Sequence, residues 1–278
     1  MAIRIGISGW TYPPWRGTFY PPGLPQRREL GYVAERLTSV EINGSFYSLQ
    51  RRTSFEAWAA AVPADFEFSV KGGRFITHLK KLTDVAVPLA NFYASGVLAL
   101  GGRLGPFLWQ LPPNLGFDAE RMSSFFTSLP RTAAAAASLA AGHDDRVPED
   151  RALVVAPDPG LPLRHTVEVR HESFRSPAFY ELLRRHGIGL VVADNPGKWP
   201  IIEEITTDFM YVRLHGHEEL YASGYSEDAL DVWAARVLGW AEAGQDVYVY
   251  CDNDAKVRAP YDAMELLERV RTASVGGG

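Results

Sequence analysis

The residues best suited to chemistry stand at the ends of short apolar runs. In "HTVEVRHESF", residues 165–174, Glu168 and Arg170 alternate with valines. "FMYVRLHGHE", residues 209–218, repeats the arrangement with Arg213 and His215. This alternation is typical of a β-strand with one apolar face. A carboxylate, two guanidinium groups and an imidazole indicate proton transfer and anion binding, provided that they share one pocket.

Length and composition define the class of protein. The chain has 278 residues, of which 46% are hydrophobic and 22% charged, as in ordinary globular proteins. No apolar run reaches the roughly 18 residues of a membrane span, and "IRIGISGW" follows Met1 so closely that we expect no secretory signal peptide. Cys251 is the single cysteine, which excludes an intrachain disulfide and favours a cytoplasmic location. The net charge of −5 disfavours nucleic acid binding through a broad basic surface.

Eight β-rich segments alternate with helical patterns from one end of the chain to the other. The predicted strands are Ile3–Gly9, Ser39–Asn43, Phe66–Lys71, Phe107–Leu111, Thr166–Arg170, Gly189–Asp194, Met210–His215 and Asp246–Asp252. Alternation of this kind implies parallel βαβ units, and eight strands close a (β/α)8 barrel at about 250 residues. We therefore predict an α/β fold of the TIM-barrel type.

Helix signals fall between most of these strands. Asp118 is the expected N-cap of a helix at Asp118–Leu129, whereas Ser176, Pro177 and Gly187 are expected to begin and end another at 176–187. Further helices are predicted at Glu29–Leu37, at Ser226–Gly244 and from Pro260 onward. Residues 195–208 show no helical pattern, so the connection between the sixth and seventh strands is expected to be irregular. We predict one domain over residues 1–273, with a helical and loop insertion at 131–164 and a flexible tail at 274–278.

A barrel changes the meaning of the alternating polar residues. Helices cover the outside of a barrel, so a strand side chain points either at the helices or into the barrel. Along each predicted strand, every second residue is apolar. The residues between them are mostly polar: Ser8, Trp10, Glu41, Asn43, Glu67, Ser69, Lys71, Gln110, Glu168, Arg170, Asp194, Arg213, His215, Asp252 and Asp254. The polar set concentrates toward the carboxyl ends of the strands, where barrel enzymes build their active sites. Buried charges are costly, so these groups must largely neutralise one another.

Motifs along nearly the whole chain resemble a known family. "GISGWTYPPWRGTFYP", "VEINGSFY", "LGPFLWQLPP", "EVRHESF", "VVADNPGKWP", "YVRLHGHEELYASGYS" and "YVYCDNDAKVRAP" occur in the order found in domain-of-unknown-function family 72, the YecE-like proteins. The resemblance implies a TIM-type barrel and no assigned reaction. The positions that match the family pattern are Gly9, Trp10, Glu41, Asn43, Phe46, Tyr47, Lys71, Thr77, His78, Gln110, Pro112, Glu168, Arg170, His171, Asp194, Arg213, His215, Gly216, Asn253 and Asp254. Phe174 departs from the usual Trp, and "CDND" at 251–254 departs from the usual Phe-Asn-Asn-Asp.

Each candidate residue has a structural alternative. Glu168 is a candidate general acid or base, or else one partner of an ion-pair network that braces the barrel. His215 is a candidate proton shuttle or a histidine bonded to a loop. Lys71 could bind an anion or form a Schiff base, although a salt bridge to Glu41 or Glu168 is favoured. His78 is equally suited to a ligand contact and to a loop hydrogen bond.

Two further alternatives concern a metal and an aromatic loop. Glu168, Asp194 and His215, with His217 or Asp254, would give mixed nitrogen and oxygen ligands for a metal, but their arginine neighbours are unfavourable for a cation. Several aromatic residues lie between positions 10 and 20. They would form either a stacking wall for a sugar or base, or the loop's own small core, which is slightly favoured.

We expect an enzyme that performs acid–base chemistry on a small anionic ligand, phosphorylated or carboxylate, without a cofactor. Glu168, His215 and Lys71 are the expected catalytic residues. The expected ligand-binding residues are Trp10, Glu41, Asn43, His78, Gln110, Arg170, His171, Asp194, Arg213, Asn253 and Asp254. A metal-dependent phosphodiester hydrolase and a non-catalytic ligand-binding module are the alternatives. A sugar-like ligand is also compatible, whereas nucleic acid is not favoured and no membrane partner is expected.

Overall fold

The chain forms a closed barrel of eight parallel strands in sequential order, shown by a computed structural model that describes residues 1–276 and their side chains through residue 273. The strands are β1 (Ile3–Ser8), β2 (Ser39–Ile42), β3 (Glu67–Lys71), β4 (Leu104–Gln110), β5 (His165–Glu168), β6 (Gly189–Asp194), β7 (Phe209–Leu214) and β8 (Asp246–Cys251). All eight predicted strands are present, with ends that differ by up to three residues, so the predicted TIM-type barrel is confirmed.

The helices are α1 (Glu29–Ala34), α2 (Gly44–Tyr47), α3 (Arg52–Ala60), α4 (Ala86–Ala94), α5 (Ala119–Ser128), α6 (Ala133–Ala140), α7 (Pro177–His186), α8 (Glu227–Glu242) and α9 (Ala259–Gly276). Within the described residues, none is both long and apolar enough to cross a membrane. The flexible tail was expected at 274–278; α9 includes 274–276, and 277–278 lie outside the described residues.

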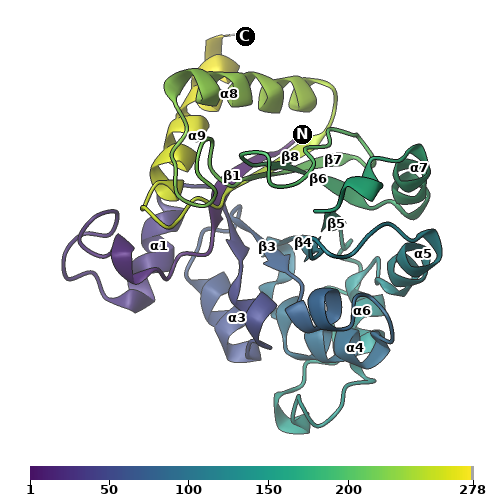
Figure 1. Cartoon of the computed structure of the whole chain (residues 1–278). Helices are drawn as coiled ribbons and strands as arrows, with labels where there is room; N and C mark the ends of the chain where they lie inside the picture. Colours follow the sequence, from purple (N-terminus) through teal and green to yellow (C-terminus); the bar gives the residue numbers. More distant parts are fainter. Residues whose placement is uncertain (277–278) are drawn as a thin grey trace. The chain divides into compact units, whose positions relative to one another are not determined.

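Contacts divide the chain into two compact units. Unit 1 comprises residues 1–41 and 190–278, and unit 2 comprises residues 42–189. In unit 1, β8 pairs on one side with β1 and on the other with β7, and α8 packs against α9 (Figure 1). In unit 2, β4 pairs with β3 and β5, and α4 packs against α6. Each unit therefore carries its own part of the sheet and its own covering helices.

Local sequence signals explain where several helices begin and end. The Asp118 carboxylate accepts the backbone N–H of Arg121 at 2.9 Å, as expected of an N-cap. Pro177 occupies the first turn of α7, and Gly187 ends it in the left-handed conformation with φ of 56°. Ser176 precedes α7 as predicted, but its side chain makes no capping hydrogen bond. Residues 195–208 contain no helix, which confirms the predicted irregular connection between β6 and β7.

The segment predicted as an insertion, residues 131–164, is part of unit 2. Its Ala-rich part is α6, which Thr132 caps through the backbone N–H of Ala135. The Pro- and Asp-rich part contains a single 3-10 turn at Glu149–Arg151. The backbone N–H of Leu153 donates to the carbonyl of Ala94 at the end of α4. This excursion is therefore fastened to α4 and does not form a domain of its own.

Gly6 shows how tightly β1 and β2 approach each other. A Cβ at Gly6 would lie 2.0 Å from the backbone carbonyl oxygen of Ser39, a distance that no side chain can occupy. In contrast, a Cβ at Gly239, inside α8, would meet nothing within 4 Å.

We expect Gly6→Ala to lower the free energy of unfolding by about 3 kcal/mol, because the strands must separate to admit the methyl group. The matched substitution Gly239→Ala should raise it by about 0.5–1 kcal/mol through the higher helix propensity of Ala. Urea unfolding of both variants checks the pair. Equal stability of Gly6→Ala and the wild type would contradict the close approach of the strands.

Candidate active site

Arg213 is the centre of a buried ion network in unit 1. Its side chain extends from β7 and has no exposed surface. It donates to both carboxylate oxygens of Glu41, from Nη2 at 2.8 Å and from Nε at 3.1 Å. Nη2 also donates to Oδ2 of Asp252 at 2.9 Å and lies 3.2 Å from the hydroxyl of Ser8. Side chains from β1, β2 and β7 and from the end of β8 thus meet at one guanidinium group.

Glu41 also has several hydrogen-bond partners. Besides Arg213, it accepts the hydroxyl groups of Tyr211 at 2.7 Å and Ser8 at 2.9 Å, and it is fully buried. Glu41 and Arg213 were expected to touch a ligand. Their burial and mutual hydrogen bonds instead favour a positioning role in the network.

Asp252 connects this network to His215. Its Oδ2 lies 2.9 Å from Nδ1 of His215, and both groups follow the carboxyl ends of β7 and β8. A carboxylate at Nδ1 holds the imidazole in one orientation and directs proton exchange to Nε2. The rings of Trp199 and Tyr221 lie nearly perpendicular to the imidazole, with centroids 5.5 and 5.4 Å from it. His215 is therefore an oriented imidazole enclosed by two aromatic side chains.

Asp254 lies beside the same network. Burial and the neighbouring negative charge of Asp252 raise the pKa of the Asp254 carboxyl, whereas a hydrogen bond with Tyr12 opposes the shift. The Tyr12 hydroxyl also donates to the carbonyl of Ser8 at 2.6 Å. A carboxyl with a raised pKa retains its proton more readily than an ordinary aspartate, which is a property of general acids.

The remaining predicted residues of unit 1 have structural partners. Asp194 accepts the hydroxyl of Tyr225 at 2.9 Å. Asn253 is fully buried and donates to the carbonyl of Ser223 and to the Asp262 carboxylate, at 2.8 and 2.6 Å. These contacts fasten the loops after β6, β7 and β8 to one another.

The aromatic loop between positions 10 and 20 packs largely on itself. Trp15 is fully buried, and its ring contacts those of Phe19 and Tyr20, with centroids 5.7 and 6.1 Å away. The Tyr20 hydroxyl donates to the carbonyl of Trp10 at 2.7 Å, and Trp10 is itself buried. This arrangement supports the alternative in which the loop builds its own small core.

Unit 2 carries the second group of predicted residues. Glu168, at the end of β5, is fully buried, and both Nε and Nη2 of Arg170 lie 2.7 Å from its Oε1. The Arg170 side chain remains 11% exposed. The pair is therefore a buried carboxylate held by an arginine that still reaches solvent.

Lys71 and Gln110 lie at the ends of β3 and β4, and His78 lies in the turn at Phe75–Leu79 that follows β3. The Lys71 ammonium group lies over the ring of Phe46, 4.6 Å from its centroid, and the Phe46 ring also meets His78 edge-on at 5.1 Å. Gln110 Nε2 is 3.5 Å from Nε2 of His78, whose Nδ1 is 2.9 Å from the Thr77 hydroxyl. The ring of Phe46 thus brings an ammonium group and an imidazole together.

The charges around His78 are mainly positive. Burial lowers the pKa of His78 to about 4, with further lowering from Arg170, Lys71 and Arg74 and an opposing effect from Glu168. Three cations against one carboxylate make this an electropositive region in which the imidazole is neutral at pH 7. Arg74 is not among the predicted site residues, because "KGGR" at 71–74 lacks the spacing of a phosphate-binding loop and gives no other signal.

Backbone strain marks the segment that carries His78. Residues Phe75–Leu79 form a π-helical turn, η3, a rare conformation often found at functional sites. Lys81, Leu82 and Asp84 follow with φ of 49°, 68° and 51°, values that cost free energy in residues other than glycine. Sequence periodicity gives no signal for such a segment.

Asn43 and His171 differ in their surroundings. The side-chain oxygen of Asn43, directly after β2, is buried and has no hydrogen-bond partner among the described residues. His171 is exposed, and its Nδ1 accepts the backbone N–H of Ser173 at 3.2 Å, which caps the 3-10 turn Glu172–Phe174. Asn43 could therefore still receive a donor from a ligand, whereas His171 has a local structural role.

Within the residues that the structure describes, no group of three or more His, Cys, Asp or Glu side chains is placed to hold a metal ion.

Arg213→Met should lower the free energy of unfolding by about 3–5 kcal/mol, because two buried carboxylates lose their cation. Arg52→Met is the matched control. It removes an exposed pair with Glu56 at 2.7 Å and should cost less than about 1 kcal/mol. Chemical denaturation of both variants measures the difference, and similar costs for the two would show that the Arg213 network is unimportant for stability.

The ring protons of His78 should titrate by NMR with a midpoint near pH 4. Lys71→Gln should move the midpoint upward, because loss of a neighbouring positive charge makes protonation of the imidazole easier. Lys198→Gln removes an exposed lysine in unit 1 and should leave the midpoint unchanged. An unshifted midpoint in Lys71→Gln would argue against an electropositive region around His78.

Comparison with known proteins agrees with this architecture. The sequence model of the family described as "Protein of unknown function DUF72" matches residues 4–276. The UPF0759 protein YunF of Bacillus subtilis (strain 168) is 22% identical, over 96% of this chain and 94% of that protein.

Two solved structures show the same fold. A DUF72 family protein from Thermotoga maritima is 26% identical with a TM-score of 0.78, covering 98% of this chain and 100% of that one. A DUF72 family protein from Enterococcus faecalis is 16% identical with a TM-score of 0.73, covering 97% and 95%. These matches confirm the resemblance found in the sequence motifs. Because the family model spans nearly the whole chain, this protein belongs to the DUF72 family.

Proposed function

We propose that this protein is an enzyme that performs acid–base chemistry on a small anionic ligand at the carboxyl ends of the barrel strands. The observation that carries the proposal is the Asp252–His215 pair, in which a buried carboxylate 2.9 Å from Nδ1 orients an imidazole. Asp252 is in turn fixed by Arg213. An imidazole held in this way is suited to move a proton at Nε2.

The charge around His78 supports an anionic ligand. Lys71, Arg74 and Arg170 all lower the pKa of His78, so their positive charges exceed what Glu168 neutralises. Arg170 remains partly exposed, and its guanidinium group is suited to a carboxylate or phosphate. Within unit 2, Lys71 and Arg170 are thus suited to bind an anionic group, with Glu168 keeping Arg170 in position.

Access to His215 sets a condition on the mechanism. The imidazole has no exposed surface, so Trp199 or Tyr221 must move before a ligand can reach Nε2. Tyr221 has φ of 62°, a conformation that costs free energy and that a loop movement would release. Asp254, with its raised pKa, would then serve as the proton donor in unit 1.

Deuterium exchange tests the proposal. A compound whose carbon atom loses a proton and regains one in D2O incorporates deuterium from the solvent, whatever the overall reaction is. The protein is incubated in D2O with a panel of sugar phosphates and phosphorylated carboxylic acids, and each compound is analysed by mass spectrometry and NMR. We expect at least one compound to gain deuterium or to change its bonding. His215→Asn, whose amide can still donate to Asp252, should slow this change roughly 10²-fold or more.

His186→Gln is the matched control, because His186 lies at the end of α7 and bonds to Ser123. It should leave the rate unchanged. A compound that binds but is recovered without deuterium and without change would favour a binding module instead. Equal rates for His215→Asn and the wild type would remove His215 from the mechanism.

A further inference from the structure

We propose that a groove on unit 2 binds a small phosphorylated ligand that carries an apolar group. The groove is formed by residues 49–52, the π-helical turn η3, α4 and residues 146–151. It uses none of the residues assigned to the proposed acid–base chemistry, so the two proposals are independent. We call it the arginine groove.

The arginine groove consists of two cavities of different character. One has a volume of about 140 Å³, and its lining includes Arg51, Arg52, Arg146 and Arg151. The other has a volume of about 70 Å³ and is mostly apolar, with walls from Phe75, Ile76, Pro88 and Phe92. Leu49 and Arg146 line both cavities. A basic compartment and an apolar compartment are therefore joined by two shared side chains.

The basic compartment has an excess of positive charge. Within the described part of the chain, Arg51, Arg146 and Arg151 form no ion pair, whereas Arg52 pairs with Glu56 at 2.7 Å. No Asp or Glu lines either cavity. Several guanidinium groups around one cavity match a dianionic phosphoryl group, because each can donate two parallel N–H bonds to its oxygens.

Asp144 is one of several acidic residues near this compartment, together with Asp145, Glu149 and Asp150, and its carboxylate already has partners. Oδ1 accepts the side-chain N–H of Asn91 at 2.9 Å and the backbone N–H of Arg146 at 3.0 Å. Those hydrogen bonds lower the pKa of Asp144, so the group is ionised and held in the loop. The side-chain oxygen of Asn91 accepts the backbone N–H of Asp144, also at 2.9 Å. Asp144 and Asn91 thereby fasten the Arg146 loop to α4.

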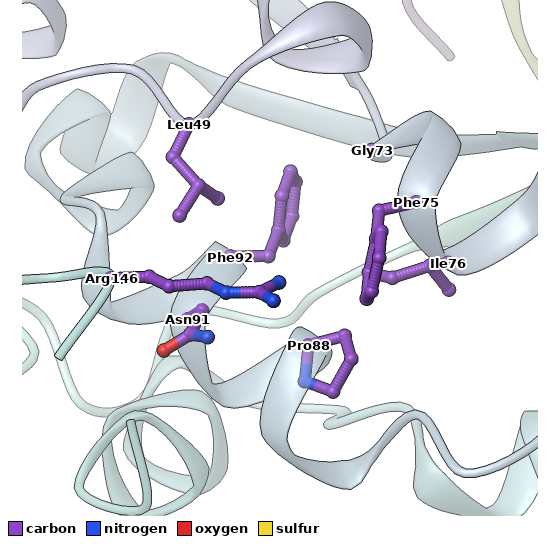
Figure 2. A pocket seen from close by; sticks show the side chains of 8 residues that line it. All are labelled: Leu49, Gly73, Phe75, Ile76, Pro88, Asn91, Phe92 and Arg146. Carbon is purple, nitrogen blue, oxygen red and sulfur yellow. The ribbon is translucent and has the colours of Figure 1, made fainter. Parts of the chain in front are cut away.

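The Arg146 side chain connects the two compartments. Figure 2 shows it extending into the apolar cavity, with its guanidinium group pointing toward Phe75 and Pro88. The guanidinium carbon is 5.0 Å from the centroid of the Phe75 ring, within the range of a cation–π contact. A ligand could thus meet a cation and an aromatic face together, which favours a phosphate attached directly to a planar apolar group.

Exposed apolar side chains lie in the same segments. Leu49 is 38% exposed, Val87 beside Pro88 is 44% exposed, and Leu79 in η3 is 63% exposed. Apolar surface of this kind near a cavity is typical of a binding site. Of these three residues, Leu49 lines both cavities and can contact the apolar group, whereas the arginines account for the charge.

The probe is 4-fluorophenyl phosphate, whose binding to the whole protein is followed by titration calorimetry and ¹⁹F NMR. We expect it to bind roughly tenfold more tightly than inorganic phosphate, because its ring enters the apolar cavity. 4-Fluorophenol, which has the ring without the phosphate, should not bind measurably at the same concentrations. Equal affinity for the aryl phosphate and inorganic phosphate would overturn the role of the apolar cavity.

Variants locate the binding site. Arg146→Gln and Arg51→Gln should each weaken binding of the aryl phosphate by at least roughly tenfold, while Phe75→Ala should bring its affinity down to that of inorganic phosphate. Arg185→Gln, which replaces an exposed arginine on α7 that does not line this groove, is the matched control and should change nothing.

Lys71→Gln distinguishes this groove from the anion site proposed for the strand ends. Binding of 4-fluorophenyl phosphate that survives Lys71→Gln and is lost in Arg146→Gln supports the arginine groove. Binding that is lost in Lys71→Gln and survives Arg146→Gln, or no binding by the wild type, would refute it. Circular dichroism confirms that each variant is folded before titration.

Discussion

The buried positive charge of Arg213 must be neutralised by nearby carboxylates, and this requirement constrains the architecture of unit 1. Arg213 is fully buried, and a guanidinium group cannot release its proton at any pH at which proteins fold. The free-energy cost of burying this charge is offset only if the carboxylates of Glu41 and Asp252 both contact the guanidinium group, and those residues come from different strands. A shift of any one strand by a single residue would turn its carboxylate to the other face of the sheet. The network therefore specifies the register of β1, β2, β7 and β8 as well as contributing to stability.

The same network sets the candidate chemistry. Oδ2 of Asp252 is shared between Nη2 of Arg213 and Nδ1 of His215, at 2.9 Å from each. Arg213 keeps this carboxylate in one place, and the carboxylate keeps the imidazole in one orientation. A residue required for folding thus also orients a residue proposed to move protons, so substitutions of Arg213 are expected to affect both properties.

Much of the fold could be predicted, because its signals are local. Strand alternation indicates the inward parity of Glu41, Glu168 and Arg213, and capping residues such as Asp118 and Gly187 mark helix ends. The partners within the barrel could not be predicted, since a period of two fixes the face of a side chain but not its neighbour. Strand periodicity gives no sign, for example, that the ammonium group of Lys71 lies over the ring of Phe46.

Some elements could not be predicted from the sequence, and the physical reason differs from one element to the next. The segment of α4, "AVPLANFYA", is apolar almost all round, so it shows no amphipathic period, and most of it is buried. The π-helical turn at 75–79 and the positive φ angles at 81–84 are conformations that tertiary contacts impose on ordinary residues. These segments carry His78 and line the arginine groove, which is why neither site could be assembled from the sequence alone.

Arg213, His78 and Asp254 illustrate two ways in which this protein accommodates an ionisable group that is removed from water. Arg213 cannot lose its charge, so it is surrounded by carboxylates. His78 and Asp254 can become neutral, and in both cases burial is the largest cause of a pKa shift toward the neutral form. Neighbouring charges of like sign add to the shift in each case, namely the cations around His78 and Asp252 beside Asp254. A group whose pKa is shifted in this direction takes its neutral form more readily than the same group in water, so its protonation can respond to a change in the local charge. The shifted groups are therefore better suited to respond to a bound anion, and the paired groups to keep the strand ends in place.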